Sequence, residues 1–239
     1  MRTPLVIAHR GDSSRALENS LDAIRLALSV PADMIEIDIR KSRDDQLFLM
    51  HDGNTGRTAD RAVDIEGSTS EDIAEVRLNN GEPVPTLKDA IDLIQGRVAL
   101  NIEVKSDGAG AGVAVFFHGS RYNGAVFLSS SKEAEIAAAR AVMPALPVAC
   151  ILKVFTPEAV SAYKEKGYRF VSLQKKTVSE ELVTACHTMG IGVYVWTIDE
   201  EEDMRRFVSW DVDGIYTNRP AVLKGLLESG TLSRTERKI

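Results

Sequence analysis

Short apolar runs alternate with amphipathic segments along most of this chain. Eight apolar runs of strand length predict strands, at residues 5–8, 34–39, 98–104, 125–129, 147–152, 169–173, 191–196 and 213–217. Helical spacing predicts helices between them, beginning near Asn19 or Ser20 and at Thr86, and then at 111–118, 131–141, 157–166, 179–189, 200–209 and 220–228. Regular alternation of this kind is typical of parallel sheets, and eight strand–helix units close a barrel. We therefore predict a single (β/α)8 barrel, the TIM-barrel architecture, over residues 1–230.

One further strand is expected directly after the second strand. Residues 42–45 are turn-like, and the short apolar run at 46–50 would return antiparallel to form a hairpin. Folding about the centre of a two-residue turn at 43–44 places residues whose numbers sum to 87 opposite each other. The predicted register therefore pairs Glu36 with His51, and Asp38 with Leu49.

The connection at 53–85 is polar and rich in turns, with only a weak helical signal at 70–78. A connection of this length between core elements is more often functional than idle, so we expect a small insertion that covers the site. The polar segment 231–239 is expected to be a flexible tail.

Composition excludes several classes of protein. The net charge of -6 and a pI near 5.4 argue against a nucleic-acid partner, because the only basic block is the short stretch 234–238. No apolar run approaches the roughly 18 residues of a membrane span, and the first strand begins too close to Met1 for a leader peptide. Cys150 and Cys186 form no CxxC motif and are expected to be free thiols. A cytoplasmic enzyme without stable membrane insertion is the expectation, and its oligomeric state is left open.

Three carboxylates lie at the ends of two predicted strands. Glu36 and Asp38 alternate on one face of the second strand, and Glu103 follows from the strand at 98–104. The strand ends of a barrel meet at one rim, where three close carboxylates would repel one another unless a cation lay between them. Oxygen ligands favour Mg²⁺, Ca²⁺ or Mn²⁺ over Zn²⁺. The cluster predicts one divalent metal site, and a solvated edge-strand face is the alternative.

Two histidines follow strands that converge on the same cluster. His9 ends the first strand and His51 ends the hairpin. Two imidazoles beside a metal-bound phosphate can divide proton transfer, one accepting a proton from the attacking group while the other protonates the leaving oxygen. His9 and His51 are therefore the predicted catalytic pair. His118 and His187 lie in predicted helices without chemical neighbours and are expected to be structural.

Three further residues are candidates for substrate contact. Arg10 and Lys105 would supply positive charge to the nonbridging oxygens of a phosphate, Arg as a fork and Lys as a point charge. Trp196, at the end of an apolar strand, could form a wall of the substrate pocket, although a core position at the top of the barrel is the alternative.

The run Ser106 to Val113 invites a dinucleotide-loop interpretation, because it contains three glycines after a strand and before a helix. Its third glycine has the wrong spacing, and the motif would lie in mid-chain. We interpret these glycines as a flexible loop after the strand.

Taken together, these motifs resemble those of the glycerophosphodiester phosphodiesterase family in its compact cytoplasmic bacterial form. Eight of them occur in order and span nearly the whole chain: His9-Arg10-Gly11, Glu18-Asn19-Ser20-Leu21, Glu36-Ile37-Asp38, His51-Asp52, Pro83 to Leu87, Asn101 to Lys105, Val195-Trp196-Thr197 and Asp213 to Pro220. Asn218 departs from the pattern, since the family commonly has Asp there.

The resemblance implies a barrel with a small insertion after the hairpin, a divalent metal held by Glu36, Asp38 and Glu103, and acid/base catalysis by His9 and His51. It also implies cleavage of deacylated phospholipids to sn-glycerol 3-phosphate and an alcohol. For the mechanism we expect attack by the neighbouring hydroxyl of the substrate, which forms a cyclic phosphate that water opens. The alternatives are a phosphodiesterase or lysophospholipase D acting on another phosphodiester, and a non-catalytic phosphate-binding barrel.

Overall fold

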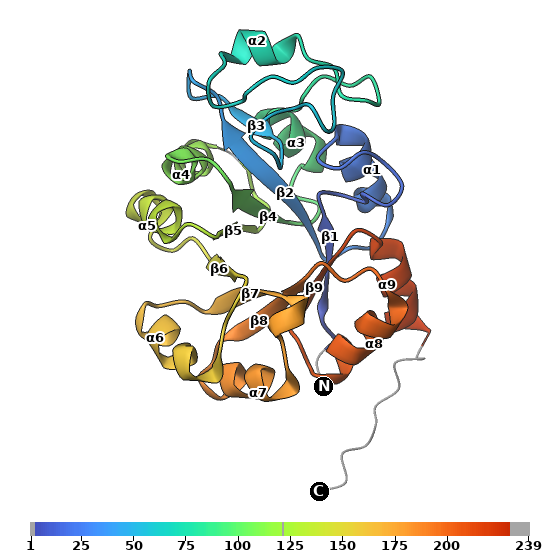
Figure 1. Cartoon of the computed structure of the whole chain (residues 1–239), viewed down its shortest axis with the longest axis vertical. Helices are drawn as coiled ribbons and strands as arrows, with labels where there is room; N and C mark the ends of the chain where they lie inside the picture. Colours follow the sequence, from blue (N-terminus) through green and yellow to red (C-terminus); the bar gives the residue numbers. More distant parts are fainter. Residues whose placement is uncertain (1–2, 121, 230–239) are drawn as a thin grey trace, which may run out of the picture.

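Eight parallel strands form a closed ring in the computed structural model, which describes residues 3–120 and 122–229 (Figure 1). The ring contains β1 (Leu5–His9), β2 (Met34–Lys41), β4 (Ala99–Val104), β5 (Val126–Ser130), β6 (Val148–Leu152), β7 (Phe170–Gln174), β8 (Gly192–Trp196) and β9 (Gly214–Thr217). Neighbours follow chain order, and β1 closes the ring by pairing with both β2 and β9. The predicted (β/α)8 barrel is confirmed.

Helices cover the outside of this ring (Figure 1). They are α1 (Leu21–Ser29), α3 (Leu87–Ile94), α4 (Ala109–Gly119), α5 (Glu133–Val142), α6 (Val160–Glu165), α7 (Glu180–Thr188), α8 (Glu201–Ser209) and α9 (Pro220–Glu228), with 3-10 turns η1 (Pro157–Ala159) and η2 (Lys175–Thr177). The short helix α2 (Ser70–Ala74) lies apart from the ring, beyond the hairpin. The predicted caps are present, because Ser20 Oγ accepts from Ala23 N at 3.0 Å and Thr86 forms a capping box with Asp89. No helix in the described ranges combines the length and hydropathy that crossing a bilayer requires.

The alternation of side chains along β2 separates the core from the site. Ile35, Ile37 and Ile39 are fully buried in the apolar layer between the ring and the helices. The intervening Glu36 and Asp38 therefore face the interior of the ring, where they are also buried. A second, smaller apolar cluster that includes Ile7, Met34, Phe127, Tyr194 and Tyr216 packs below them inside the barrel, so the polar residues occupy only the carboxyl end.

The hairpin exists, but its predicted register is wrong by one residue. The return strand β3 (Leu47–Leu49) pairs antiparallel with β2 so that Ile39 faces Leu49 and Lys41 faces Leu47, which are pairs whose numbers sum to 88. The reason is the loop, which has three residues between Ser42 and Gln46, with Asp45 in the left-handed region at φ 66°. Asp38 therefore lies opposite Met50 rather than Leu49, and its carbonyl accepts from Met50 N at 3.1 Å.

The segment at 53–85 forms a small packed unit beside the hairpin, at the top of Figure 1. The weak helical signal corresponds to the single short helix α2, whose Ile73 is fully buried. Ile73 packs in an apolar cluster of this segment and the hairpin, together with Phe48, Met50, Ala59, Ile65, Val76, Leu78 and Val84. The segment therefore has its own small core, which fixes it on the β2–β3 side of the barrel.

The interpretation of the glycine run as a flexible loop is wrong. Gly110 and Gly112 lie inside α4, and only Gly108 precedes it, as an N-cap in the left-handed region at φ 74°. A Cβ on Gly110 would lie 2.2 Å from the Glu135 carbonyl oxygen, so glycine there lets α4 and α5 pack closely. Cys150 and Cys186 are buried free thiols, as expected. The predicted tail at 231–239 lies outside the described residues.

Candidate active site

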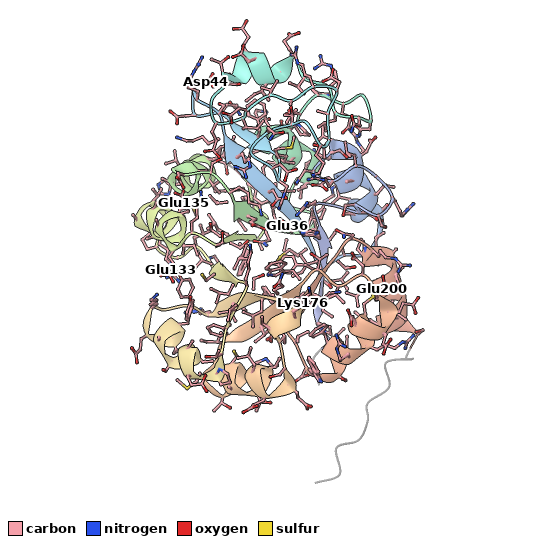
Figure 2. The ribbon with its side chains drawn as sticks, in the orientation of Figure 1. Glu36, Asp44, Glu133, Glu135, Lys176 and Glu200 are labelled. Atoms are coloured by element: carbon pink, nitrogen blue, oxygen red, sulfur yellow. The ribbon has the colours of Figure 1, made fainter. Side chains whose placement is uncertain are left out.

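Three carboxylates converge inside the barrel at its carboxyl end. Glu36 and Asp38 come from β2, and Glu103 comes from β4, where it is the register partner of Asp38. One oxygen from each lies within 4.8 Å of the other two, and Glu36 and Asp38 are almost completely buried. Figure 2 shows Glu36 on the inner side of the strand ring. The structure thus brings together the three residues that the sequence predicted as metal ligands.

The three carboxyl groups of this cluster have different pKa values. Burial and the neighbouring Asp38 raise the pKa of Glu36 well above its usual range, and the same two causes raise the pKa of Glu103 to about 7. Burial acts in the same direction on Asp38, but Lys105 and Arg10 outweigh it and lower the pKa of that carboxyl to about 2. Oε1 of Glu36 is buried and accepts no hydrogen bond from any described residue. A buried, unsatisfied carboxylate oxygen in a cluster of three acids fits a hard cation.

Arg10 and Lys105 both lie against this cluster. Arg10 Nε is 3.1 Å from Asp38 Oδ2, and its backbone N–H donates to Glu36 Oε2 at 2.8 Å. Lys105 Nζ is 3.2 Å from Asp38 Oδ1 and also forms an ion pair with Glu103. The two cations that the sequence assigned to a phosphate are therefore fixed beside the carboxylates.

His9 is held by an amide. Its Nδ1 lies 2.7 Å from Oδ1 of Asn218, whose Nδ2 donates to Asp199 Oδ2 at 2.7 Å. The NH₂ group of Asn218 donates to Asp199, so Oδ1 of the same amide faces the His9 ring. That oxygen can only accept a hydrogen bond, so the proton of neutral His9 is on Nδ1, and Nε2 is left as an acceptor. Burial and the nearby Arg10 lower the pKa of His9 to about 4, which keeps the ring neutral near pH 7.

His51 is held by a carboxylate. Its Nδ1 lies 2.7 Å from Asp52 Oδ1, and the other oxygen of Asp52 accepts from Arg57 Nε at 2.5 Å. Arg57 also donates two hydrogen bonds to Glu18, at 2.8 and 2.6 Å, and Glu18 in turn accepts from Arg10 at 2.7 Å. Hydrogen bonds from His51 and Arg57 outweigh burial and lower the pKa of Asp52. A continuous chain of charged groups therefore joins the insertion to the carboxylate cluster.

The residue that follows Glu18 also supports the site directly. Asn19 donates from Nδ2 to Asp38 Oδ2 at 2.8 Å and accepts from Asp38 N at 3.1 Å. It adopts the left-handed conformation at φ 56°, which Asn tolerates better than most residues. Asn19 therefore orients Asp38, in addition to lying next to the helix cap at Ser20.

A cavity of about 330 Å³ opens over these groups. His9, His51, Glu36 and Glu103 line it, together with Ser129, Ser172, Trp196 and Tyr216. Trp196 Nε1 is buried and has no hydrogen-bond partner among the described residues. All the predicted site residues except the fully buried Asp38 line this one pocket, whereas His118 and His187 do not.

A sequence model of the glycerophosphoryl diester phosphodiesterase family matches residues 9–222. The chain belongs to this family. A glycerophosphodiester phosphodiesterase from Caldanaerobacter subterraneus is 29% identical over 245 residues, which cover 95% of this chain and 98% of that protein.

A phosphodiesterase structure from Oleispira antarctica, solved with the product sn-glycerol-3-phosphate, superposes with a TM-score of 0.88 at 21% identity, covering 94% of this chain and 97% of that one. A glycerophosphoryl diester phosphodiesterase-like structure from Silicibacter pomeroyi gives a TM-score of 0.86 at 23% identity over 98% of this chain and 96% of that one. Both structures show the same fold.

In this member of the phosphodiesterase family, the sequence alone did not identify the residues that hold the two histidines. Asn218 was noted only as a departure from the family pattern, and Asp199 and Arg57 were not singled out. The motif at residues 51–52 pointed to Asp52, but no spacing rule connects position 9 with position 218. Their roles depend on the partners that the fold supplies.

Proposed function

We propose that this protein hydrolyses glycerophosphodiesters to sn-glycerol 3-phosphate and an alcohol, and that it requires one divalent metal ion. The observation that carries the proposal is the buried three-carboxylate cluster flanked by two histidines with different partners. A site that only binds phosphate has no need of two imidazoles positioned as proton carriers.

Glu36, Asp38 and Glu103 would hold the metal, Mg²⁺ or Ca²⁺ or else Mn²⁺. The unsatisfied Oε1 of Glu36 and the raised pKa values of Glu36 and Glu103 support this assignment, because a cation between the carboxylates would offset both their burial and their mutual repulsion. When bound, such an ion supplies positive charge for the substrate phosphate and favours ionisation of a nearby hydroxyl. Arg10 and Lys105 lie beside the same cluster and would donate to the nonbridging oxygens of the phosphate.

The partners of the two histidines divide the proton transfers between them. His9 is neutral near pH 7 and presents Nε2 as an acceptor, so it serves as the first base. His51 is held through Nδ1 by the carboxylate of Asp52, and as the second imidazole of the pocket it serves as the first acid.

In the first step the 2-hydroxyl of the substrate's glycerol attacks phosphorus and gives its proton to His9. The bond from phosphorus to the alcohol oxygen breaks, and His51 protonates that oxygen, leaving a five-membered cyclic phosphate. In the second step the roles reverse: water loses a proton to His51 and attacks phosphorus, while His9 protonates the 2-oxygen as the ring opens. Intramolecular attack benefits from proximity, and the pocket holds both proton carriers for the exchange.

The test is turnover on glycerophosphocholine, glycerophosphoethanolamine, glycerophosphoinositol and a lysophospholipid, each with metal and with chelator. We expect the glycerophosphodiesters to be cleaved only with metal, and Glu36→Gln to reduce turnover by about 10² to 10⁴. Glu133→Gln is the matched control, because Glu133 is ion-paired with Lys166 on the outside of the barrel and does not line the cavity. Full activity of Glu36→Gln in excess chelator would contradict metal dependence, and turnover of the lysophospholipid alone would contradict the substrate class.

The neighbouring-hydroxyl step has its own test. A diester with hydrogen in place of the 2-hydroxyl should bind but be hardly cleaved. Cleavage of this deoxy diester at the rate of the parent would replace intramolecular attack with direct attack by water.

A further inference from the structure

The cavity has a floor of neutral polar groups next to Glu36 and Glu103, and a rim that carries lysines. Ser129, Ser172, Tyr216 and Asn101 form the floor and are each at most 3% exposed. They bond to one another, since Asn101 Nδ2 donates to Tyr216 Oη at 2.8 Å and Ser129 Oγ donates to Asn101 Oδ1 at 3.1 Å. Neutral hydroxyl and amide groups suit the hydroxyls of the glycerol half of a diester, which is the half that must lie near the metal cluster for its 2-hydroxyl to react.

The rim is different because it carries cations without acidic partners. Lys153, which follows β6, lines the cavity and is exposed, and Lys176, which follows β7, is exposed nearby along the same set of strand ends. Figure 2 shows Lys176 and Glu36 on facing sides of the strand ring in that view. Neither lysine forms an ion pair with any residue in the described ranges.

The neighbouring lysines show that this lack of partners is particular to these two positions. Lys132, which follows β5, is 2.6 Å from Asp107, and Lys175 is 3.1 Å from Asp203. Within the cavity itself, Arg10 and Lys105 are already paired with carboxylates. In a protein of net charge -6, uncompensated positive charge at the mouth of the site therefore favours an anion.

We propose that the leaving alcohol of the preferred substrate carries an additional anionic group, which Lys153 and, more weakly, Lys176 recognise at the rim. This inference rests on the proposed function, because it concerns the half of the same diester that lies outside the floor. The recognised chemistry is a phosphate or a carboxylate on the alcohol. A choline head group, with its quaternary ammonium, is the least suitable alcohol for this rim.

The experiment compares substrates that differ in the charge of one group. Glycerophosphoglycerol is the neutral reference, glycerophosphoglycerol phosphate and glycerophosphoglycerate add a phosphate and a carboxylate, and glycerophosphocholine adds a cation. At low ionic strength we expect kcat/KM for at least one anionic substrate to exceed that of the neutral one by about fivefold, and the ratio to shrink as salt is raised. The two anionic arms show which group the rim prefers.

The variants test the assignment through that ratio. The ratio is kcat/KM for the preferred anionic substrate divided by kcat/KM for glycerophosphoglycerol. Lys153→Ala should bring this ratio close to one, and Lys153→Glu should bring it below one. Lys176→Ala should lower it less than Lys153→Ala does. Lys88→Ala is the matched control for loss of one positive charge, because Lys88 is 70% exposed on α3 and ion-paired with Asp92, and it should keep the wild-type ratio. A structural effect would lower both rates equally. A wild-type ratio of one, or a ratio unchanged in Lys153→Glu, overturns the proposal.

Binding separates this proposal from the proposed function. Calorimetry on the His9→Ala protein with Mg²⁺ should show tighter binding of the preferred anionic diester than of glycerophosphoglycerol, and Lys153→Glu in the same protein should abolish the difference. If no diester is turned over by the wild-type protein, the proposed function fails while this binding difference still tests the rim. Equal binding of the two diesters overturns the rim proposal whatever the turnover.

Discussion

The two histidines of the pocket sit in contrasting surroundings. His9 lies on a strand of the barrel, and its partner is the neutral amide of Asn218, which is itself fixed by Asp199 from the loop after β8. His51 lies at the edge of the hairpin, and its partner is the carboxylate of Asp52, which is fixed by Arg57 from the insertion. The same imidazole thus meets an amide in one region and an acid in the other. The two rings are therefore oriented by different chemistry, a neutral amide for His9 and a carboxylate for His51, and the proposed division into base and acid can be tested at each ring separately.

The largest effect should come from removing each histidine and changing the leaving group. His9→Ala and His51→Ala should each lower turnover of glycerophosphoglycerol by about 10² to 10⁴. With p-nitrophenol as the leaving alcohol, which needs no proton, His51→Ala should recover to within about tenfold of wild type while His9→Ala should not. Single-turnover rates of alcohol release from the two diesters measure this, because steady-state turnover also uses His51 as the base of the second step. Recovery of His9→Ala instead would reverse the assignment of base and acid.

Arg57 tests whether the insertion is needed to orient His51. Arg57→Gln removes the donors that hold Asp52 and Glu18, so we expect kcat to fall by about 10-fold to 100-fold with a smaller change in KM. The matched control is Arg61→Gln, because Arg61 is exposed in the same segment and has no side-chain bond to the site. A double-mutant cycle with Asp52→Asn should show that the two losses are far from additive. Additive losses would mean that Arg57 acts elsewhere.

The neutral environment of His9 should be visible in stability. The pKa of His9 is about 4 in the folded protein, against 6.5 for an ordinary histidine. Between pH 4 and pH 6.5 the unfolded chain therefore binds a proton at this histidine that the folded protein does not bind. The free energy of unfolding should therefore decrease as pH falls through this window, with a contribution from His9 of up to about 1.4 kcal/mol per pH unit. Urea unfolding in chelator should show a shallower dependence for His9→Gln. An identical dependence in both proteins would contradict the neutral assignment.

The smallest effect should follow from exchanging the chemistry of the His9 partner. Asn218→Asp alone would place two acids at the 2.7 Å contact with Asp199, so the informative variant is the double exchange Asp199→Asn with Asn218→Asp. The double exchange restores a hydrogen-bond donor to the contact between positions 199 and 218. It also gives His9 a carboxylate partner, which raises the pKa of His9. The acid limb of kcat/KM should move to higher pH by about one unit, with activity at pH 8 within about threefold of wild type. The single variant Asn218→Asp is the comparison.

Most of the barrel and of the pocket could be predicted from the sequence because both rest on local patterns. Apolar runs located the eight strands of the ring, and polar residues at their ends located the carboxylates, both histidines and both cations. The register of the hairpin could not be predicted in this way, since Asp45 extends the loop to three residues without a glycine to mark the left-handed position. The glycines of α4 were misread because their reason is the backbone of α5, which only the packed structure supplies.

The supporting residues were the least predictable part of the site. Asn218 matters because of His9, and Arg57 because of Asp52 and Glu18, and in each case the partner lies on a different element. Family resemblance locates the residues of the sequence motifs, whereas the hydrogen-bond partners of those residues follow from tertiary contacts.

The contact between His9 and Asn218 joins residues separated by 209 positions, at the seam where β1 meets β9. Contacts between the first and last strands carry a large loop-closure cost and form late when a chain folds. During refolding, helices and most strand pairs can therefore recover before Asn218 orients His9. Enzymatic activity should lag behind the circular dichroism signal, and recovery of turnover would report the closing of the ring.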